Sequence, residues 1–174
     1  VFLLGSGSSI NDISDEQWNH IDSHDSIGLN RWPIHEFTPT YYVFEHHMNP
    51  KEEVFNRKHW NMIDSVQDRY EEIPVIMKDT SAVRDRLERH QLPRWLRGKL
   101  ILSSDSGFTQ IVGWNSSQKQ NEKLLKYLDY KGHFDPDEFG IQYRKRGSIS
   151  YLIHLSTVLG YENIVLCGVD RVDS

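Results

Sequence analysis

The stretch that decides the fold is VFLLGSGSSIND, residues Val1–Asp12, in which an apolar run enters a turn of glycine and serine. A second segment near the other end, RGSISYLIHLSTVLGYENIVLCGVD, covers Arg146–Asp170. Each segment joins a buried strand to a small-residue turn at a helix start, which is how α/β folds build a nucleotide phosphate site. In the turn Gly5–Ser9 the small residues let backbone N–H groups approach a ligand closely. Together the two segments predict a nucleotide-handling domain.

Short apolar runs alternate with helical stretches along the chain, which is the pattern of a parallel sheet covered by helices. The prediction is therefore an α/β fold, a Rossmann-like three-layer domain with a mostly parallel central sheet. Helices are expected from a capping box at Ser14 to about His24, over Pro50–Tyr70, and over Ile149–Leu159 behind a cap at Ser148. The expected strands are Val1–Leu4, Ser26–Leu29, Tyr41–Glu45, Val75–Met77, Leu100–Leu102 and Ile164–Cys167.

Length and composition fit a single nucleotide-binding domain over residues 1–174. Between residues 92 and 143 the alternation weakens, and glycine and proline punctuate short segments. This region is predicted to be a variable lid or acceptor-side insertion, with a helix over Asn121–Tyr130. Because Val1 begins directly inside a strand without an initiator methionine, we expect the chain to be a fragment of a longer protein.

Charge and cysteine content narrow the function classes. The formal net charge of -5 argues against a nucleic-acid binder, which needs a basic surface. The basic cluster Arg144–Arg146 is interpreted as a solvated loop, with an anionic-ligand or membrane-surface contact as the alternative. The single cysteine, Cys167, lies in an apolar strand, which fits a small core residue in a reducing cytoplasm. No apolar stretch approaches the length that crosses a bilayer.

The glycine-rich turn differs from the common nucleotide fingerprints. Ile10 occupies the third glycine position of the dinucleotide pattern, and no P-loop lysine follows, so NAD and ATP are poor candidates. A tight strand-to-helix turn explains Gly5–Ser9 about as well as ligand binding does. Asn30 ends the second expected strand, where its carboxamide would read a base or ribose, or would only form the turn.

The nine histidines do not predict a metal site. His46 and His47 are adjacent and point to opposite sides of a strand. His20 and His24 lack the glutamate and the third ligand of a zinc site, so solvated surface histidines are the better interpretation. His154 lies among apolar helix residues, where a structural role is favoured over a catalytic one. No catalytic triad can be identified from spacing.

Four segments resemble the bacterial sialyltransferases of glycosyltransferase family 42 and related transferases of CMP-linked ulosonic acids. GSGSSIND looks like their first nucleotide turn, G-N-G-P-S, with Ser6 where the family has Asn. GLNRW resembles the C-N-Q motif and places Asn30 at a nucleotide-contacting asparagine. YYVFEHHMNP resembles V-F-Y-N-P, which matches Asn49 with two residues inserted or His46 with none. The segment ending in LCGVD is similar to T-S-G-x-Y, A-L-G-Y and a strand ending G-I-D.

The last of these matches places Ser148 at the serine that contacts the nucleotide and Asp170 at the aspartate ending the strand. The LGY-x-x-I-x-L-x-G-[IV]-D pattern also occurs in hydroxymethylpterin diphosphokinase-like proteins. The resemblance covers about half of the chain. It implies a nucleotide site formed by Gly5, Ser6, Gly7, Ser8, Asn30, His46, Asn49, Gly147, Ser148 and Asp170.

In function, the resemblance implies an inverting, metal-free glycosyltransferase of bacterial surface polysaccharide or lipopolysaccharide synthesis. It would transfer a sialic acid-like or Kdo-like sugar from a CMP-activated donor to a glycan acceptor, without a bound cofactor. The family's general-base histidine and phosphate-contacting tyrosines follow the final strand, so no catalytic residue is assigned here. The expected location is the cytoplasm or the inner face of the bacterial inner membrane. Peripheral membrane association and oligomerisation stay open, and no nucleic-acid partner is expected.

Two alternatives remain beside the transferase. A pterin diphosphokinase-like enzyme needs Mg²⁺ and ATP, for which Asp105, Asp170 and Asp173 are candidate metal ligands at strand ends. A non-catalytic nucleotide-binding domain would have no base near its site.

Overall fold

The chain divides into two compact units. The computed structural model describes residues 1–45, 53–79, 92–97, 100–107, 126, 142–144 and 148–170. The first unit comprises Val1–Leu102 with Ile164–Ser174, and the second comprises Ser103–Asn163. The boundaries of the expected insertion at 92–143 stay a prediction.

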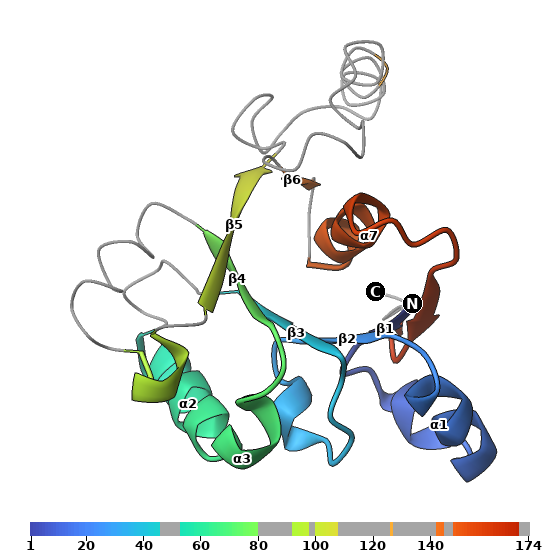
Figure 1. The fold of residues 1–174 in the computed structure, drawn as a ribbon, viewed down its shortest axis with the longest axis horizontal. Coiled ribbons are helices and arrows are strands. Elements are labelled where there is room, and N and C mark those ends of the chain that lie inside the picture. The colour runs from blue at the N-terminus through green and yellow to red at the C-terminus, as the bar shows by residue number, and fades with distance from the viewer. Residues whose placement is uncertain are drawn as a thin grey trace. The chain divides into compact units, whose positions relative to one another are not determined.

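The first unit is built on a parallel sheet with the strand order β4-β3-β2-β1-β7 (Figure 1). Every neighbouring pair in this order is parallel. The predicted α/β, Rossmann-like fold is therefore confirmed. The strands are β1 (Phe2–Leu4), β2 (Ser26–Leu29), β3 (Tyr41–Phe44), β4 (Val75–Asp79) and β7 (Val165–Cys167).

Two further strands pair in parallel with each other. They are β5 (Leu100–Gly107), which runs five residues beyond the expected end at Leu102, and β6 (Gln142–Arg144). β6 was not predicted, because QYR carries no apolar alternation that marks a strand. In the second unit, β6 lies close to helix α7 (Ser148–Val158).

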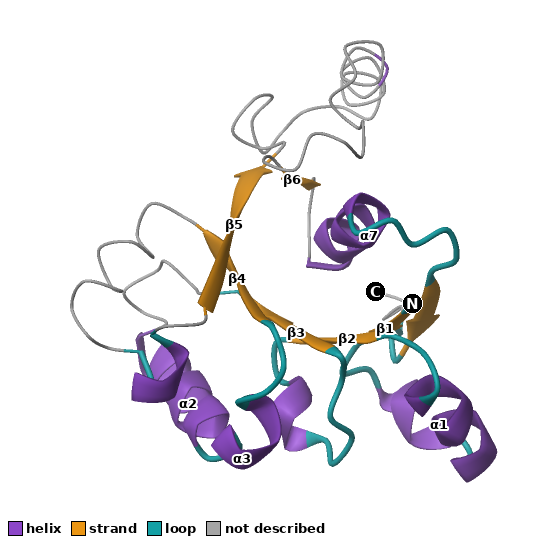
Figure 2. Cartoon of the chain, in the orientation of Figure 1, coloured by secondary structure: helices purple, strands orange, loops and turns teal. Residues whose placement is uncertain are grey.

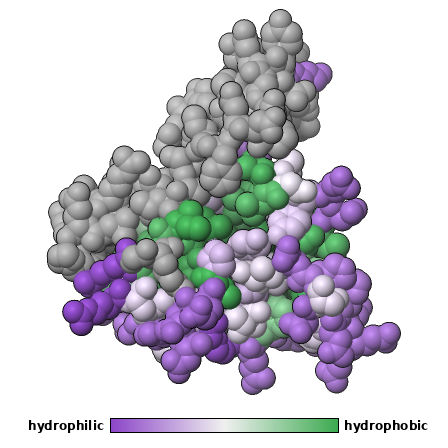
Figure 3. Space-filling view, viewed as in Figure 1, coloured by the Kyte–Doolittle hydropathy of each residue, from purple (hydrophilic) through white to green (hydrophobic). Residues whose placement is uncertain are grey.

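The helices α1 (Asp15–Asp22), α2 (Glu53–Asp64) and α3 (Gln67–Tyr70) cover one face of the first unit's sheet (Figures 1 and 2). Their outward sides are largely hydrophilic (Figure 3). Short 3-10 helices complete the connections: η1 (Ser8–Asp12), η2 (Trp32–Ile34) and η4 (Arg94–Leu96). Within the described ranges, no helix has the length and apolar character needed to span a bilayer.

The predicted capping box at the start of α1 is confirmed. The backbone N–H of Ser14 donates to Oε1 of Gln17 at 2.9 Å, and the N–H of Gln17 donates to Oγ of Ser14 at 3.3 Å. The two residues thus satisfy each other's unpaired donors, and the acidic Asp15 and Glu16 lie favourably in the first turn.

The prediction of a single helix over Pro50–Tyr70 is wrong in one respect. The structure has two helices there, α2 and α3, with an interruption between them. The N–H of Val66 donates to the carbonyl of Ile63, three residues back, and φ of Val66 is -114°. Ser65 also turns its hydroxyl onto the carbonyl of Met62 at 2.8 Å. A β-branched residue after a serine that bonds its own turn favours this interruption. Pro50 itself lies outside the described residues.

The core of the first unit lies between the sheet and the helices. The strands contribute Leu4, Tyr42, Phe44, Val75 and Met77, all fully buried. Ile21, Trp60, Ile63 and Tyr70 pack against them from α1, α2 and α3.

Trp32 packs into the same core over Gly28 of β2, where no side chain occupies the space. A Cβ atom at Gly28 would lie 2.5 Å from the indole of Trp32, so only glycine leaves room for that ring. This packing holds η2 directly beyond the carboxyl end of β2.

Helix α7 begins one residue earlier than expected, because Ser148 is its first helical residue. It ends before Gly160, whose φ of +86° closes the helix. The N–H groups of Gly160 and Tyr161 donate to the carbonyls of Thr157 and Ser156 at 3.0 and 3.1 Å. The helix expected over Asn121–Tyr130 lies outside the described residues except for Lys126, which is helical.

Candidate functional site

The turn after β1 packs against the turn after β7. The N–H of Gly5 donates to the carbonyl of Cys167 at 2.8 Å, and the N–H of Gly7 donates to the carbonyl of Gly168 at 2.7 Å. A Cβ atom at Gly5 would lie 2.4 Å from the Gly168 oxygen, and Gly168 itself has φ of +62°. The glycines of both turns are therefore required by close contact between two backbone segments.

Asp170 accepts the hydrogen bonds of the serine turn. Its Oδ2 accepts from the hydroxyl of Ser8 at 2.9 Å and from the backbone N–H of Ser9 at 3.0 Å, and its Oδ1 accepts from the Ser9 hydroxyl. These bonds from Ser9 and Ser8 hold the pKa of the exposed Asp170 carboxyl below its ordinary value. A carboxylate of this protein thus occupies the donors at the start of η1.

This contact lies where a Rossmann-like sheet commonly binds its ligand. The strand order reverses at β1, which has β2 on one side and β7 on the other. Ligands of such folds bind beyond the carboxyl ends of the strands at this switch point. Here the bonds between Asp170 and the serines close the β1–β7 side, and the open space lies toward β2.

Asn30 forms the turn after β2. Its φ is +53°, in the left-handed region that asparagine tolerates better than most residues. Its N–H donates to the carbonyl of Val43 at 2.9 Å, and its side-chain Oδ1 accepts from the N–H of Glu45, also at 2.9 Å. Asn30 therefore joins the carboxyl ends of β2 and β3 and uses its side-chain oxygen to do so.

A hollow of about 480 Å³ opens beside this turn, a size typical of sites for small ligands. It lies between the serine turn and η2, at the carboxyl ends of β1 and β2. We call it the larger hollow; it is lined by Ser6, Gly7, Ser8, Ile10, Asn11, Arg31, Trp32, Ile34 and His35.

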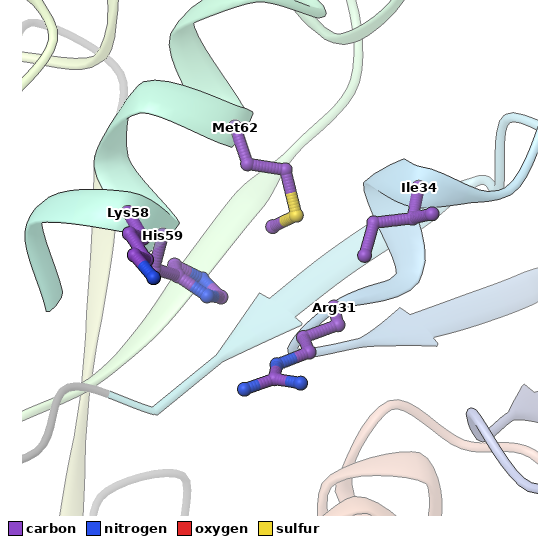
Figure 4. Close-up of a pocket in the computed structure, with 5 residues that line it drawn as sticks. All are labelled: Arg31, Ile34, Lys58, His59 and Met62. Carbon is purple, nitrogen blue, oxygen red and sulfur yellow. The ribbon is translucent and has the colours of Figure 1, made fainter. Parts of the chain in front are cut away.

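A second hollow of about 350 Å³ lies between η2 and α2 and is called the smaller hollow. Arg31 and Ile34 line it from the β2 side, and Lys58, His59 and Met62 line it from α2 (Figure 4). The Arg31 side chain extends toward α2, and Met62 extends from α2 toward Ile34 (Figure 4).

The charges of both hollows favour an anionic ligand. The described residues that line the hollows include the cations Arg31 and Lys58 but no carboxylate. The whole chain carries a net charge of -5, so this local excess of positive charge runs against the average of the protein. Clefts lined by one sign of charge concentrate ligands of the opposite sign.

Arg69 of α3 fixes the segment that carries these residues. Its guanidinium donates to the carbonyls of Pro33, His35 and Glu36 at 2.9, 3.0 and 2.7 Å. Trp32 holds the same segment from the core side, and its Nε1–H donates to the carbonyl of Phe37 at 3.0 Å. The rim of the larger hollow is thus held from two sides.

His35 lines the larger hollow, and its neutral ring has one N–H donor. Its Nδ1 accepts from the N–H of Phe37 at 3.0 Å, so in the neutral ring Nε2 carries the proton. Partial burial lowers the pKa of His35 and thereby favours this neutral form. Glu36 has a smaller effect in the opposite direction. The ring stacks on Trp32 with centroids 4.6 Å apart and lies 4.9 Å from the ring of Trp18.

His59 is oriented by Tyr42 beneath the smaller hollow. The hydroxyl of Tyr42 donates to the carbonyl of Asn30, and its oxygen lies 3.1 Å from Nε2 of His59. Because the hydroxyl has only one proton, the Nε2–H of His59 donates to the Tyr42 oxygen. Burial raises the pKa of Tyr42 well above its ordinary value, so the phenol keeps its proton.

The structure brings only some residues of the predicted nucleotide site close to one another. Gly5, Ser6, Gly7, Ser8 and Asp170 come together, and Asn30 lies at the same edge of the sheet. Ser148 belongs to the second unit. His46, Asn49 and Gly147 lie outside the described residues, as do Asp173 and the side chain of Asp105.

Sequence reasoning placed Ser6, Gly7 and Ser8 in the site but missed other residues that line the hollows. Among those it missed are Arg31, Ile34, His35, Lys58, His59 and Met62. A cation directly after a strand was the available signal, since Arg31 follows Asn30 in GLNRW. The residues of α2 gave none, because their approach to Arg31 depends on how α2 packs.

Structural roles fit three further histidines of the described residues, His20, His24 and His154, and the single cysteine Cys167. The rings of His20 and His24 lie 4.6 Å apart on α1 and the residues after it, and both contact the ring of Phe2. No group of three potential ligands that could hold a metal occurs in the part of the chain that is described. Burial raises the pKa of the Cys167 thiol, as fits a core residue, and burial lowers the pKa of His154.

Comparison with known proteins adds no relative. No family model, curated protein or solved structure matches this chain.

Proposed function

We propose that the first unit binds the nucleotide of a CMP-activated acidic sugar and forms the donor-binding part of a bacterial glycosyltransferase. The larger hollow is the observation that carries this proposal. It combines hydroxyls, a carboxamide, a guanidinium and a stacked imidazole at the carboxyl edge of a parallel sheet. The resemblance of the sequence to CMP-sugar transferases supplies the identity of the nucleotide.

The position of Ile10 supports CMP over a dinucleotide. Ile10 is 6% exposed and belongs to the core cluster, so the third glycine of the dinucleotide pattern is replaced by a core residue. The third glycine normally allows close packing of helix on strand, and here η1 intervenes instead. A compact mononucleotide therefore fits this turn better than NAD does.

The proposed transfer needs two forms of chemical help. The negative charge that develops on the departing CMP must be stabilised, and Arg31 offers a permanent positive charge for this. The acceptor hydroxyl must lose a proton to a base. His35 is not suited to that role, because its Nδ1 already accepts a hydrogen bond and its Nε2 bears the proton.

Thermal unfolding tests the proposal, with EDTA present for CMP and NAD and with Mg²⁺ in place of EDTA for ATP. A ligand that binds only the folded protein stabilises it by about 2.7 kcal/mol at 100 times its Kd. CMP is expected to raise the melting temperature without a metal, whereas NAD, and ATP with Mg²⁺, raise it less. An equal or larger shift with NAD, or one that requires Mg²⁺ and ATP, contradicts it. Release of CMP from CMP-sialic acid by the protein separates a transferase from a non-catalytic binding domain.

A further inference from the structure

The two hollows are neighbours that share one boundary. Arg31 and Ile34 line both of them, so these two side chains lie between the larger and the smaller hollow. Ile34 is 72% exposed, so its side chain is accessible to a ligand. A ligand that filled both hollows would therefore pass over Arg31 and Ile34.

We propose that Arg31 binds the phosphate that joins the two halves of the donor. The nucleoside then occupies the larger hollow and the sugar occupies the smaller one, where Lys58 binds the carboxylate of the sugar. This inference rests on the proposed function and assigns its phosphate and carboxylate contacts to residues that no motif marks.

Arg31 suits a phosphate by its chemistry and its position. A guanidinium donates two parallel hydrogen bonds to a phosphate, and its charge persists at every physiological pH. Arg31 is exposed and follows the left-handed residue Asn30, whose backbone and side chain are both hydrogen bonded to β3 and the residue after it. The phosphate would also lie within the hollow that His35 lines.

The serine turn, by contrast, is poorly suited to the phosphate. The N–H of Gly7 already donates to Gly168, and both Ser8 and Ser9 donate to the carboxylate of Asp170. A phosphate at these donors would have to displace that carboxylate or lie against its negative charge. The phosphate is therefore expected on the Arg31 side of the larger hollow.

The smaller hollow suits a carbon body that carries an anion. Ile34 and Met62 provide apolar walls, and Lys58 provides an exposed ammonium at the edge. An ammonium is a compact point charge that pairs with one carboxylate. An activated sugar bearing a carboxylate beside its anomeric carbon matches this combination. A neutral sugar would offer Lys58 no anionic group to bind.

Calorimetric titration of four proteins tests the assignment: the wild type, Arg31→Gln, Lys58→Gln and the control Arg57→Gln. Arg57 is an exposed cation of α2 that lines neither hollow, so its variant repeats the charge change beside Lys58. The probes are CMP, cytidine, CMP-sialic acid and inorganic pyrophosphate. Melting temperatures and circular dichroism confirm that each variant folds.

Arg31→Gln is expected to weaken binding of CMP and of pyrophosphate by about tenfold or more, and to leave cytidine unchanged. Arg31→Lys should recover part of this loss, because it keeps the charge without the paired donors. Lys58→Gln should weaken the binding of CMP-sialic acid by about tenfold and leave the affinity for CMP unchanged. Arg57→Gln should leave the affinity for every probe unchanged.

The inference and the proposed function fail differently. If Arg31→Gln binds CMP within about twofold of the wild type, the phosphate lies elsewhere and the inference is overturned, although the protein still binds CMP. If the wild type binds pyrophosphate through Arg31 but binds no cytidine nucleotide, the anion site stands and the proposed function fails. If the wild type binds neither, both are overturned. Equal loss of CMP and CMP-sialic acid in Lys58→Gln removes the carboxylate assignment.

Discussion

The turn after β1 and the turn after β2 begin at the same edge of one sheet but use their polar groups differently. After β1, the glycines and serines bond to Gly168 and Asp170 and fill the space beside β7. After β2, Asn30 completes the turn, and the following Arg31 extends along two hollows.

The difference shows that a small-residue turn has two possible physical causes. Glycine permits the approach of a ligand, and it equally permits the approach of another backbone segment. In the β1 turn the second cause is visible as a distance of 2.4 Å from a Cβ at Gly5 to the Gly168 oxygen. After β2, a less conspicuous arginine, Arg31, lines the open space. The comparison leads to three experiments, beginning with the largest expected effect.

Gly168→Ala should be the most destabilising change in the β1 turn. Its Cβ would lie 2.6 Å from the Gly5 carbonyl oxygen, and its φ of +62° is strained for alanine. We expect a loss of about 3 kcal/mol or more in the free energy of unfolding, from the close contact and the backbone strain together. Urea denaturation measures it. CMP affinity of the folded fraction should not change, because Gly168 packs on Gly5 and lines neither hollow.

Two matched variants separate these causes. Gly5→Ala adds a clash with the Gly168 oxygen at 2.4 Å, and no left-handed φ is recorded at that position. Gly160→Ala adds a left-handed φ of +86° with nothing within 4 Å, so it costs only the strain, about 1 kcal/mol. If Gly168→Ala lowers the free energy of unfolding no more than Gly160→Ala does, the close packing of the β1 turn on the turn after β7 is wrong.

The sequence predicted the architecture of the first unit because that architecture depends on local signals. Apolar runs marked β1, β2, β3 and β7 to within a residue at either end. The capping box at Ser14 marked the start of α1. These signals act over a few neighbouring residues, so they can be identified without knowledge of the packing.

The site was less predictable because its features depend on contacts between distant segments. Nothing in GSGSS indicates that Asp170, more than 150 residues away, accepts the serine hydrogen bonds. The resemblance grouped the two as nucleotide contacts, and their mutual hydrogen bonds need the pairing of β1 with β7. The approach of Met62 and His59 to Arg31 likewise depends on the packing of α2 over Tyr42.

Asp170→Asn tests whether the donors of the β1 turn are occupied by the protein's own carboxylate rather than by a ligand. The pKa of Asp170 is below its ordinary value of 3.8, so its bonds stabilise the fold fully above that pH and are lost as the pH falls through the lowered pKa. The variant should be less stable than the wild type at pH 7, by less than Gly168→Ala. The difference should shrink below pH 3.8.

Urea midpoints at a series of pH values measure this difference, and CMP titration provides the functional comparison. If Asp170 binds only Ser8 and Ser9, the variant keeps the CMP affinity of the wild type. A clear loss of CMP affinity in a folded variant would instead make Asp170 a nucleotide contact, as the resemblance implies, and would remove the contrast between the two turns.

The smallest expected effect concerns His35 in the β2 turn. Burial lowers its pKa below 6.5, so below that pH the unfolded chain takes up a proton more readily than the folded one. This part of the stability is therefore complete above pH 6.5 and decreases as the pH falls toward the lowered pKa. His35→Asn keeps an acceptor for the N–H of Phe37 and cannot titrate. The stability of the wild type should fall relative to the variant between about pH 6.5 and pH 5, measured by urea denaturation. Because His154 and the other histidines are present in both proteins, the difference reports His35. A constant difference across that range would mean that the pKa of His35 is the same in the folded and the unfolded chain, so that burial does not favour the neutral ring.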